Sequence, residues 1–113
     1  MVSIFKMKVA KEPFEKIATG TKIIEARIFD EKRRCINIGD HIEFFQDGNL
    51  NQKVTTKVKD LYRYTTFKEL FADFPPANFG GESTDALLQE IHQFYSSEEE
   101  HRFGVIGIQI EKE

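Results

Sequence analysis

The pattern of apolar and polar residues predicts five β-strands and three helices. Strands are predicted where apolar residues alternate or cluster over short stretches, at residues 3–9, 22–29, 41–46, 52–63 and 104–110. Helices are predicted where apolar residues recur three or four positions apart, one from Lys11 to Gly20, one from Thr66 to Pro75, and one from Ser83 or Thr84 to Tyr95. The resulting order is strand, helix, three strands, two helices, strand.

Polar segments separate these elements and indicate the fold class. Residues 30–34 are predicted to form a charged turn, residues 47–49 a tight reversal, residues 75–83 a flexible loop that could cover a cleft, and residues 96–100 an irregular segment. Segregated strands and helices favour an α+β fold, and several short strands favour a small curled sheet or barrel. At 113 residues, we expect a single domain over residues 1–113.

The amino-acid composition indicates that the chain can form a core and in which type of compartment it is expected. Eleven Phe and three Tyr supply enough apolar area for a core without covalent cross-links. Cys35 is the single cysteine, so no internal disulfide can form, as is usual in a reducing compartment. No apolar run has the length of a signal sequence or a membrane span, and we therefore expect a soluble cytoplasmic protein.

Charge is distributed unevenly along the chain. Residues 1–63 hold 13 Lys/Arg and 9 Asp/Glu, a net charge of +4, whereas residues 64–113 hold 3 and 10, a net charge of −7. The overall charge of −3 disfavours wholesale coating of nucleic acid, so a nucleic-acid binder built this way needs a local basic groove. Ordinary surface variation explains the asymmetry equally well.

The predicted strand at residues 22–29 carries charges on a face that is otherwise apolar. Because alternate residues of a strand share a face, Glu25 and Arg27 lie side by side, flanked by Ile23 and Phe29. Charges that lose their water cost free energy unless each has a partner. Lys22 can join them only because it precedes the regular strand. A plain surface salt bridge is the simpler alternative.

Four ordered motifs resemble the ASCH domain family over residues 5–110. The first is G-x-K-x-x-E-x-R, formed by Gly20, Lys22, Glu25 and Arg27. The others are I-x-x-G-D-x-I-x-F (Ile36, Gly39, Asp40, Ile42, Phe44), then Y-x-[ST]-F (Tyr64, Thr66, Phe67), and finally Tyr95 with the closing segment Arg102-Phe103-Gly104-Val105-Ile106. The first motif alone is moderately specific, whereas the ordered set is strongly so.

The resemblance implies a PUA-like mixed β-barrel with about three flanking helices and a cleft lined by Lys22, Glu25 and Arg27. It also implies an RNA or nucleotide-like ligand. Arg27 and Lys22 would meet phosphate or a base, and Glu25 would contact an amino group. Other candidate ligand contacts are aromatic or polar residues of the later motifs, namely Tyr64, Thr66, Tyr95 and Arg102.

Enzymatic activity is an alternative that the same resemblance raises. Some ASCH proteins resemble hydrolases of acetylated cytidine, whose nucleophilic Thr stands three residues after the motif Lys. Here that position is Glu25, so the threonine mechanism cannot be carried over. A hydrolase of a modified nucleoside or of RNA would instead use Lys22 as base, with Glu25 and Tyr64 as the other catalytic candidates.

A protein-binding adaptor is a second alternative, with the acidic run at residues 98–100 and the glycines at residues 80–81 as docking candidates. His41, His92 and His101 share no metal-ligand spacing, and Cys35 adds none. We therefore expect no metal and no cofactor. We also expect no membrane partner, and the sequence leaves the oligomeric state open, with a monomer favoured.

Overall fold

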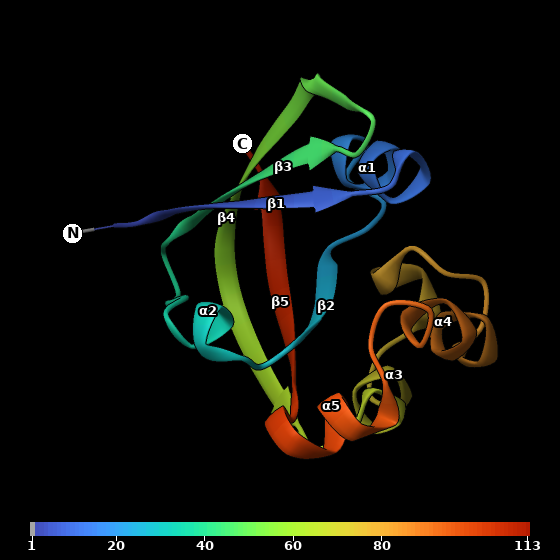
Figure 1. The fold of residues 1–113 in the computed structure, drawn as a ribbon. Helices are drawn as coiled ribbons and strands as arrows, with labels where there is room; N and C mark the ends of the chain where they lie inside the picture. The colour runs from blue at the N-terminus through green and yellow to red at the C-terminus, as the bar shows by residue number, and fades with distance from the viewer. Residues whose placement is uncertain (1) are drawn as a thin grey trace.

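The computed structural model describes residues 2–113 and contains a five-stranded mixed sheet that curls into a half-barrel (Figure 1). The strand order is β1-β3-β4-β5-β2. The strands are β1 (Ile4–Val9), β2 (Ile24–Ile28), β3 (His41–Gln46), β4 (Asn49–Tyr64) and β5 (Val105–Lys112).

The sheet is not closed into a full ring. β1 pairs in parallel with β3, and the other neighbours pair antiparallel, so β1 and β2 form the two edges. The 16-residue strand β4 spans the whole sheet and shifts register against β5 between Val58 and Asp60. Such an irregularity bends a strand, which helps the sheet to curl. The two edges consequently approach each other and leave a gap between them.

Within residues 2–113, five α-helices and one 3₁₀ turn accompany the sheet. They are α1 (Lys11–Ala18), α2 (Glu31–Arg34), α3 (Phe67–Ala72), η1 (Pro76–Phe79), α4 (Thr84–Ile91) and α5 (Ser97–Phe103). The predicted α+β class and curled sheet are confirmed, but the structure has more helices than the three predicted from the sequence.

Two of the extra helices replace segments predicted to be irregular. The Asp30 side chain accepts a hydrogen bond from the backbone N–H of Arg33, and this cap turns the predicted charged turn into α2. Ser96 and Glu99 cap each other's backbone at the start of α5, where residues 96–100 were predicted to be irregular. Both predictions were wrong because local capping outweighed the polar composition.

The third helical prediction and the loop before it also need correction. The helix was predicted to reach Tyr95, but α4 ends at Ile91, and Phe94 beyond it is 68% exposed. Residues 75–83 contain η1 and are tied to the segment before β2. The backbone N–H of Ile23 donates to the carbonyl of Asn78, and Lys16 Nζ donates to the carbonyl of Gly80.

The sheet separates two apolar clusters. The inner cluster fills the half-barrel between β1, β3, β4, β5 and α1, and it includes Phe44, Val58, Ile106 and Ile108. The outer cluster packs α3, η1 and α4 against the opposite face, and its largest fully buried side chain is Phe67. Leu70 of α3 packs directly over Gly107, where an added Cβ would lie 2.8 Å from Leu70 Cδ1.

Within residues 2–113, none of the helices combines the length and the apolar character that crossing a membrane requires.

Candidate functional site

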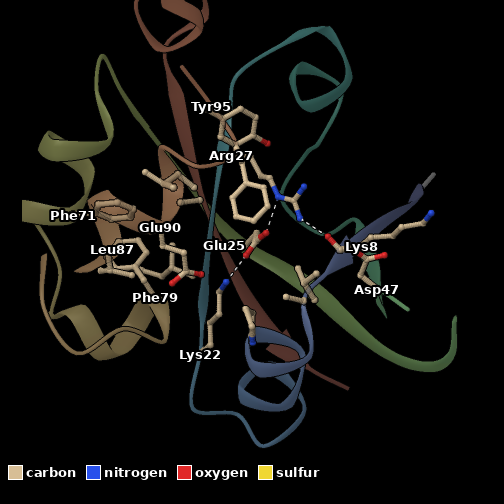
Figure 2. A pocket seen from close by; sticks show the side chains of 17 residues that line it. Lys8, Lys22, Glu25, Arg27, Asp47, Phe71, Phe79, Leu87, Glu90 and Tyr95 are labelled. Atoms are coloured by element: carbon tan, nitrogen blue, oxygen red, sulfur yellow. Dashed lines mark hydrogen bonds and ion pairs between the residues drawn. The ribbon is translucent and has the colours of Figure 1, made fainter. Parts of the chain in front are cut away.

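The site lies at the gap between the two edge strands of the half-barrel (Figure 2). Arg27 projects from β2 across this gap, and its Nη2 donates to the carbonyl oxygen of Lys8 on β1 at 3.1 Å. In a closed barrel, backbone hydrogen bonds would join these two edge strands. Here the side chain of Arg27 joins them instead. We call this gap, bounded by β1 and β2, the seam.

A buried carboxylate with two cationic partners lies beside the seam. Lys22 Nζ lies 2.5 Å from Glu25 Oε1, and Arg27 Nε lies 2.6 Å from Glu25 Oε2 (Figure 2). Glu25 is only 4% exposed, so each of its oxygens receives a charged donor in place of water. We call Lys22, Glu25 and Arg27 the triad, whose net charge is one positive unit.

The triad perturbs the ionisation of its members. Burial alone would raise the pKa of Glu25, but the attraction of Lys22 and Arg27 overcomes this effect and lowers that pKa to about 2. Burial likewise disfavours the charged form of Arg27, yet Glu25 and the Tyr95 hydroxyl together raise the pKa of the guanidinium above its usual value. Glu25 and Arg27 are therefore both held in their charged forms at neutral pH.

The end of α1 explains why Lys22 reaches a carboxylate on the next strand. Gly20 has a φ of +80°, and the backbone N–H of Lys22 donates to the carbonyl of Lys16. This glycine turn delays the start of β2 until Ile24. Because Lys22 lies before the strand, its side chain can point to the same side as Glu25. Its aliphatic stem then packs on Gly80, where an added Cβ would lie 3.3 Å from Lys22 Cδ.

The triad forms the polar side of a pocket of about 260 Å³. The opposite side comes from α3, η1 and α4 and is mainly apolar, with Phe71, Phe79, Leu87 and Ile91 lining it, but Glu90 of α4 adds a carboxylate (Figure 2). Tyr95 lies at the Arg27 end and stacks on Phe67 with the ring centroids 5.8 Å apart. The volume is just below the usual range for small-molecule sites, which suits a single small ring system.

The edge strand β2 itself runs through the pocket wall. The pocket is lined by Glu25 and Arg27 from one face of β2 and by Ile24 and Ala26 from the other. In an antiparallel ladder, successive residues direct their N–H and C=O groups alternately toward the paired strand and away from it. The backbone N–H of Phe29 donates to the carbonyl of Gly104, which directly precedes β5. Ala26 is three residues before Phe29, so the alternation directs its backbone N–H and C=O groups away from β5, toward the pocket.

Not every residue predicted to contact a ligand lies in this pocket. Lys22, Glu25, Arg27 and Tyr95 meet there.

The structure does not bring Tyr64, Thr66 or Arg102 to the pocket. The Tyr64 hydroxyl donates to Asp73 at 2.5 Å, which raises the pKa of that phenol. Thr66 caps α3 by accepting from the backbone N–H of Glu69, and the guanidinium of Arg102 lies 5.1 Å from the ring of Phe103. Tyr64 and Tyr62 share the outer face of β4, so their alternation directs them toward the helices.

Neither the apolar side of the pocket nor the contribution of β1 could be recognised in the sequence. Phe71, Phe79 and Leu87 have the spacing of core residues, and most of their surface is in fact buried in the outer cluster. Lys8 and Asp47 reach the pocket from β1 and the β3–β4 turn, which approach β2 only because the sheet curls.

Residues 2–113 contain no group of three or more His, Cys, Asp or Glu side chains that could hold a metal ion. Cys35 is exposed, and its Sγ contacts the carbonyl of Glu31 at 3.5 Å.

Fold and site together define an ASCH-type half-barrel with a charged pocket at its seam. The family model described as the ASCH domain matches residues 7–113, and the chain therefore belongs to the ASCH domain family.

Solved structures agree with this assignment. Hypothetical protein PH0355 is 36% identical with a TM-score of 0.86, over 97% of this chain and 99% of that one. Protein PF0455 from Pyrococcus furiosus is 33% identical with a TM-score of 0.76, over 96% of each chain. ASCH from Zymomonas mobilis shares the fold at 11% identity and a TM-score of 0.69, over 96% of this chain and 67% of that one. A search of curated proteins finds no significant match.

Proposed function

We propose that the pocket at the seam binds RNA or a nucleotide-like ligand. The observation that carries the proposal is the convergence of Lys22, Glu25 and Arg27 on one side of a pocket whose other side is mainly apolar and aromatic. A nucleotide has the same two-sided chemistry, because its base is flat and weakly polar whereas its phosphate and base carbonyls accept hydrogen bonds. The ASCH family is generally thought to bind RNA, which agrees with this chemistry.

The triad has unused hydrogen-bonding capacity for such a ligand. After pairing with Glu25, Lys22 still has two N–H groups, and Arg27 still has N–H groups beyond those given to Glu25 and Lys8. Each carboxylate oxygen of Glu25 can accept a second hydrogen bond, for example from a base amino group. The backbone of Ala26 adds a donor and an acceptor at the edge of β2. Tyr95 offers a ring and a hydroxyl at the rim.

The binding test uses a variant that keeps the shape of the pocket but removes one charge. Arg27→Gln is expected to weaken binding of nucleoside monophosphates and of a short single-stranded oligoribonucleotide by about tenfold or more at low salt. Isothermal titration calorimetry measures the first ligand and fluorescence anisotropy the second. Lys57→Gln, at an exposed position of β4 outside the pocket, is the matched control and should bind like the wild type.

Thermal unfolding of each variant separates loss of binding from loss of fold. The proposal is wrong if the wild type binds neither probe at low salt, or if folded Arg27→Gln protein binds both probes as tightly as the wild type.

The hydrolase and adaptor alternatives have less support. With its pKa near 2, Glu25 is a weak base, and Lys22 is engaged with that carboxylate, so the triad is better suited to holding a ligand than to moving protons. Of the acidic run proposed for docking a protein, Glu99 caps α5 and the Glu100 side chain is only 12% exposed. The run therefore serves the fold of the segment that follows Tyr95.

A further inference from the structure

A second cationic site lies in the same row of the sheet as Arg27. Ile106 of β5 pairs with Arg27 of β2 on one side and with Arg63 of β4 on the other. Residues that are directly opposite in paired strands point to the same face of a sheet, so Arg27 and Arg63 both project from the inner face. Two strand spacings separate their Cα atoms, a distance of about 10 Å.

Arg63 does not stand alone at this end of the half-barrel. Its guanidinium lies 3.8 Å from the ring centroid of Phe29, and the guanidinium of Arg34 lies 4.6 Å from the same ring. Phe29 follows β2 directly, and α2, which carries Arg34, begins two residues later. The ring of Phe29 thus holds two guanidinium groups near each other, beyond the Arg27 end of the seam.

The charges of this arginine pair are not neutralised within residues 2–113. Neither Arg34 nor Arg63 forms an ion pair with any described residue, and both are exposed. Arg33, between Arg34 and the exposed Lys32, is different because it pairs with Asp30 at 2.8 Å. Two neighbouring like charges repel each other, and a bound anion relieves that repulsion.

We propose that Arg34 and Arg63 bind a backbone phosphate of single-stranded RNA, adjacent to the nucleotide held in the pocket. Two planar guanidinium groups match the oxygens of a phosphodiester, whereas the triad already uses part of its capacity within the pocket. A short stretch of extended single strand spans the separation between Arg27 and Arg63. The inference rests on the proposed function and specifies its ligand as a polynucleotide rather than a free nucleotide.

The charge distribution of the chain supports a local site of this kind. The net charge of −3 gives no general attraction for RNA, so affinity must come from a few phosphate contacts. Arg27, Lys32, Arg34 and Arg63 all belong to the basic part of the chain, whereas the acidic run of α5 belongs to the other part.

The test compares a double variant with a matched surface control on two probes. Arg34→Gln/Arg63→Gln keeps two planar groups that can cover Phe29 but removes both charges. We expect it to bind a fluorescein-labelled ten-nucleotide single-stranded RNA about tenfold more weakly at low salt, with the slope of log K against log salt reduced by about 0.7 for one lost phosphate contact. Its affinity for nucleoside monophosphates should be unchanged, and Lys57→Gln should match the wild type on both probes.

The outcomes distinguish this inference from the proposed function. If the folded double variant binds the RNA with the affinity and salt slope of the wild type while Arg27→Gln loses binding, the arginine pair is not a phosphate site and the pocket proposal stands. Equal loss of mononucleotide and RNA binding in the double variant also overturns the inference, because the effect then comes from the pocket. If the wild type binds neither probe, the proposed function itself is wrong.

Discussion

The two faces of β2 are buried to a similar degree but have opposite chemistry. Ile24 and Ile28 project outward into the cluster under α3 and α4, where they are 1% and 2% exposed. Glu25 and Arg27 project inward at the seam, and Glu25 is almost as well covered. A single five-residue strand therefore carries both an ordinary core face and a buried ionic face.

Burial therefore has different requirements on the two faces of β2. Burying an isoleucine stabilises the fold because its apolar surface leaves water, whichever apolar atoms surround it. Its contribution to the free energy of unfolding is therefore largely independent of any one neighbour. Buried charges gain only from each other, and a single unpaired charge costs more than the pair contributes. The outer face should therefore respond to substitutions gradually, and the inner face as a unit.

Breaking the ionic face at its centre should have the largest effect. Glu25→Leu leaves Lys22 and Arg27 with no acidic partner, and we expect the free energy of unfolding to fall by about 4 kcal/mol. Replacing all three members (Lys22→Met, Glu25→Leu, Arg27→Met) should restore much of this loss, because no charge is then left unpaired. Urea unfolding measures both variants. A triple variant as unstable as the single one would contradict the idea that the triad acts as a unit.

The two faces of β2 should also differ in their response to acid, because only the inner face carries a carboxylate that can be protonated. The folded-state pKa of Glu25, about 2, lies below the value of 4.5 expected without the protein environment. The stability that the carboxylate contributes is therefore fully present above pH 4.5 and is lost as the pH falls toward 2. The shift corresponds to about 3 kcal/mol.

Urea unfolding between pH 7 and pH 2 tests this expectation on the wild type and on Glu25→Gln. The stability of the variant should fall less steeply below pH 5, by about the same 3 kcal/mol over the range. Parallel curves for the two proteins would mean that Glu25 is not the group responsible.

The outer face should show the smallest and simplest response. Ile28→Val removes one methylene from a fully packed side chain, and we expect a loss of about 1 kcal/mol in the free energy of unfolding. Nucleotide affinity should not change, since Ile28 does not line the pocket. A large drop in affinity with little change in stability would show that the two faces are not independent.

The sequence predicted the parts of the molecule that depend on neighbouring residues. Alternation along 22–29 placed Glu25 and Arg27 on one face and Ile24 and Ile28 on the other, as the paired strands have them. Lys22 was expected to escape this alternation because it precedes the regular strand, and β2 indeed begins only at Ile24. Each of these features is decided within a few residues, where spacing is informative.

Features that depend on distant segments could not be predicted. The contact of Arg27 with Lys8 requires β1 and β2 to become the two edges of one curled sheet. The apolar wall of the pocket uses Phe71 and Leu87, whose pattern in the sequence is that of any core residue. Tyr64 belonged to a recognisable motif, but its hydroxyl is bound to Asp73 on the side facing the helices.

The unclosed seam also bears on self-association. Free strand edges invite pairing with other chains, and a half-barrel has two of them. Here β2 is short and is flanked by the helical layer, while β1 presents the exposed lysines Lys6 and Lys8 along its length. Charges of this kind discourage a second copy from adding its strand at the seam. We therefore expect strand pairing between two copies at the seam to be unfavourable.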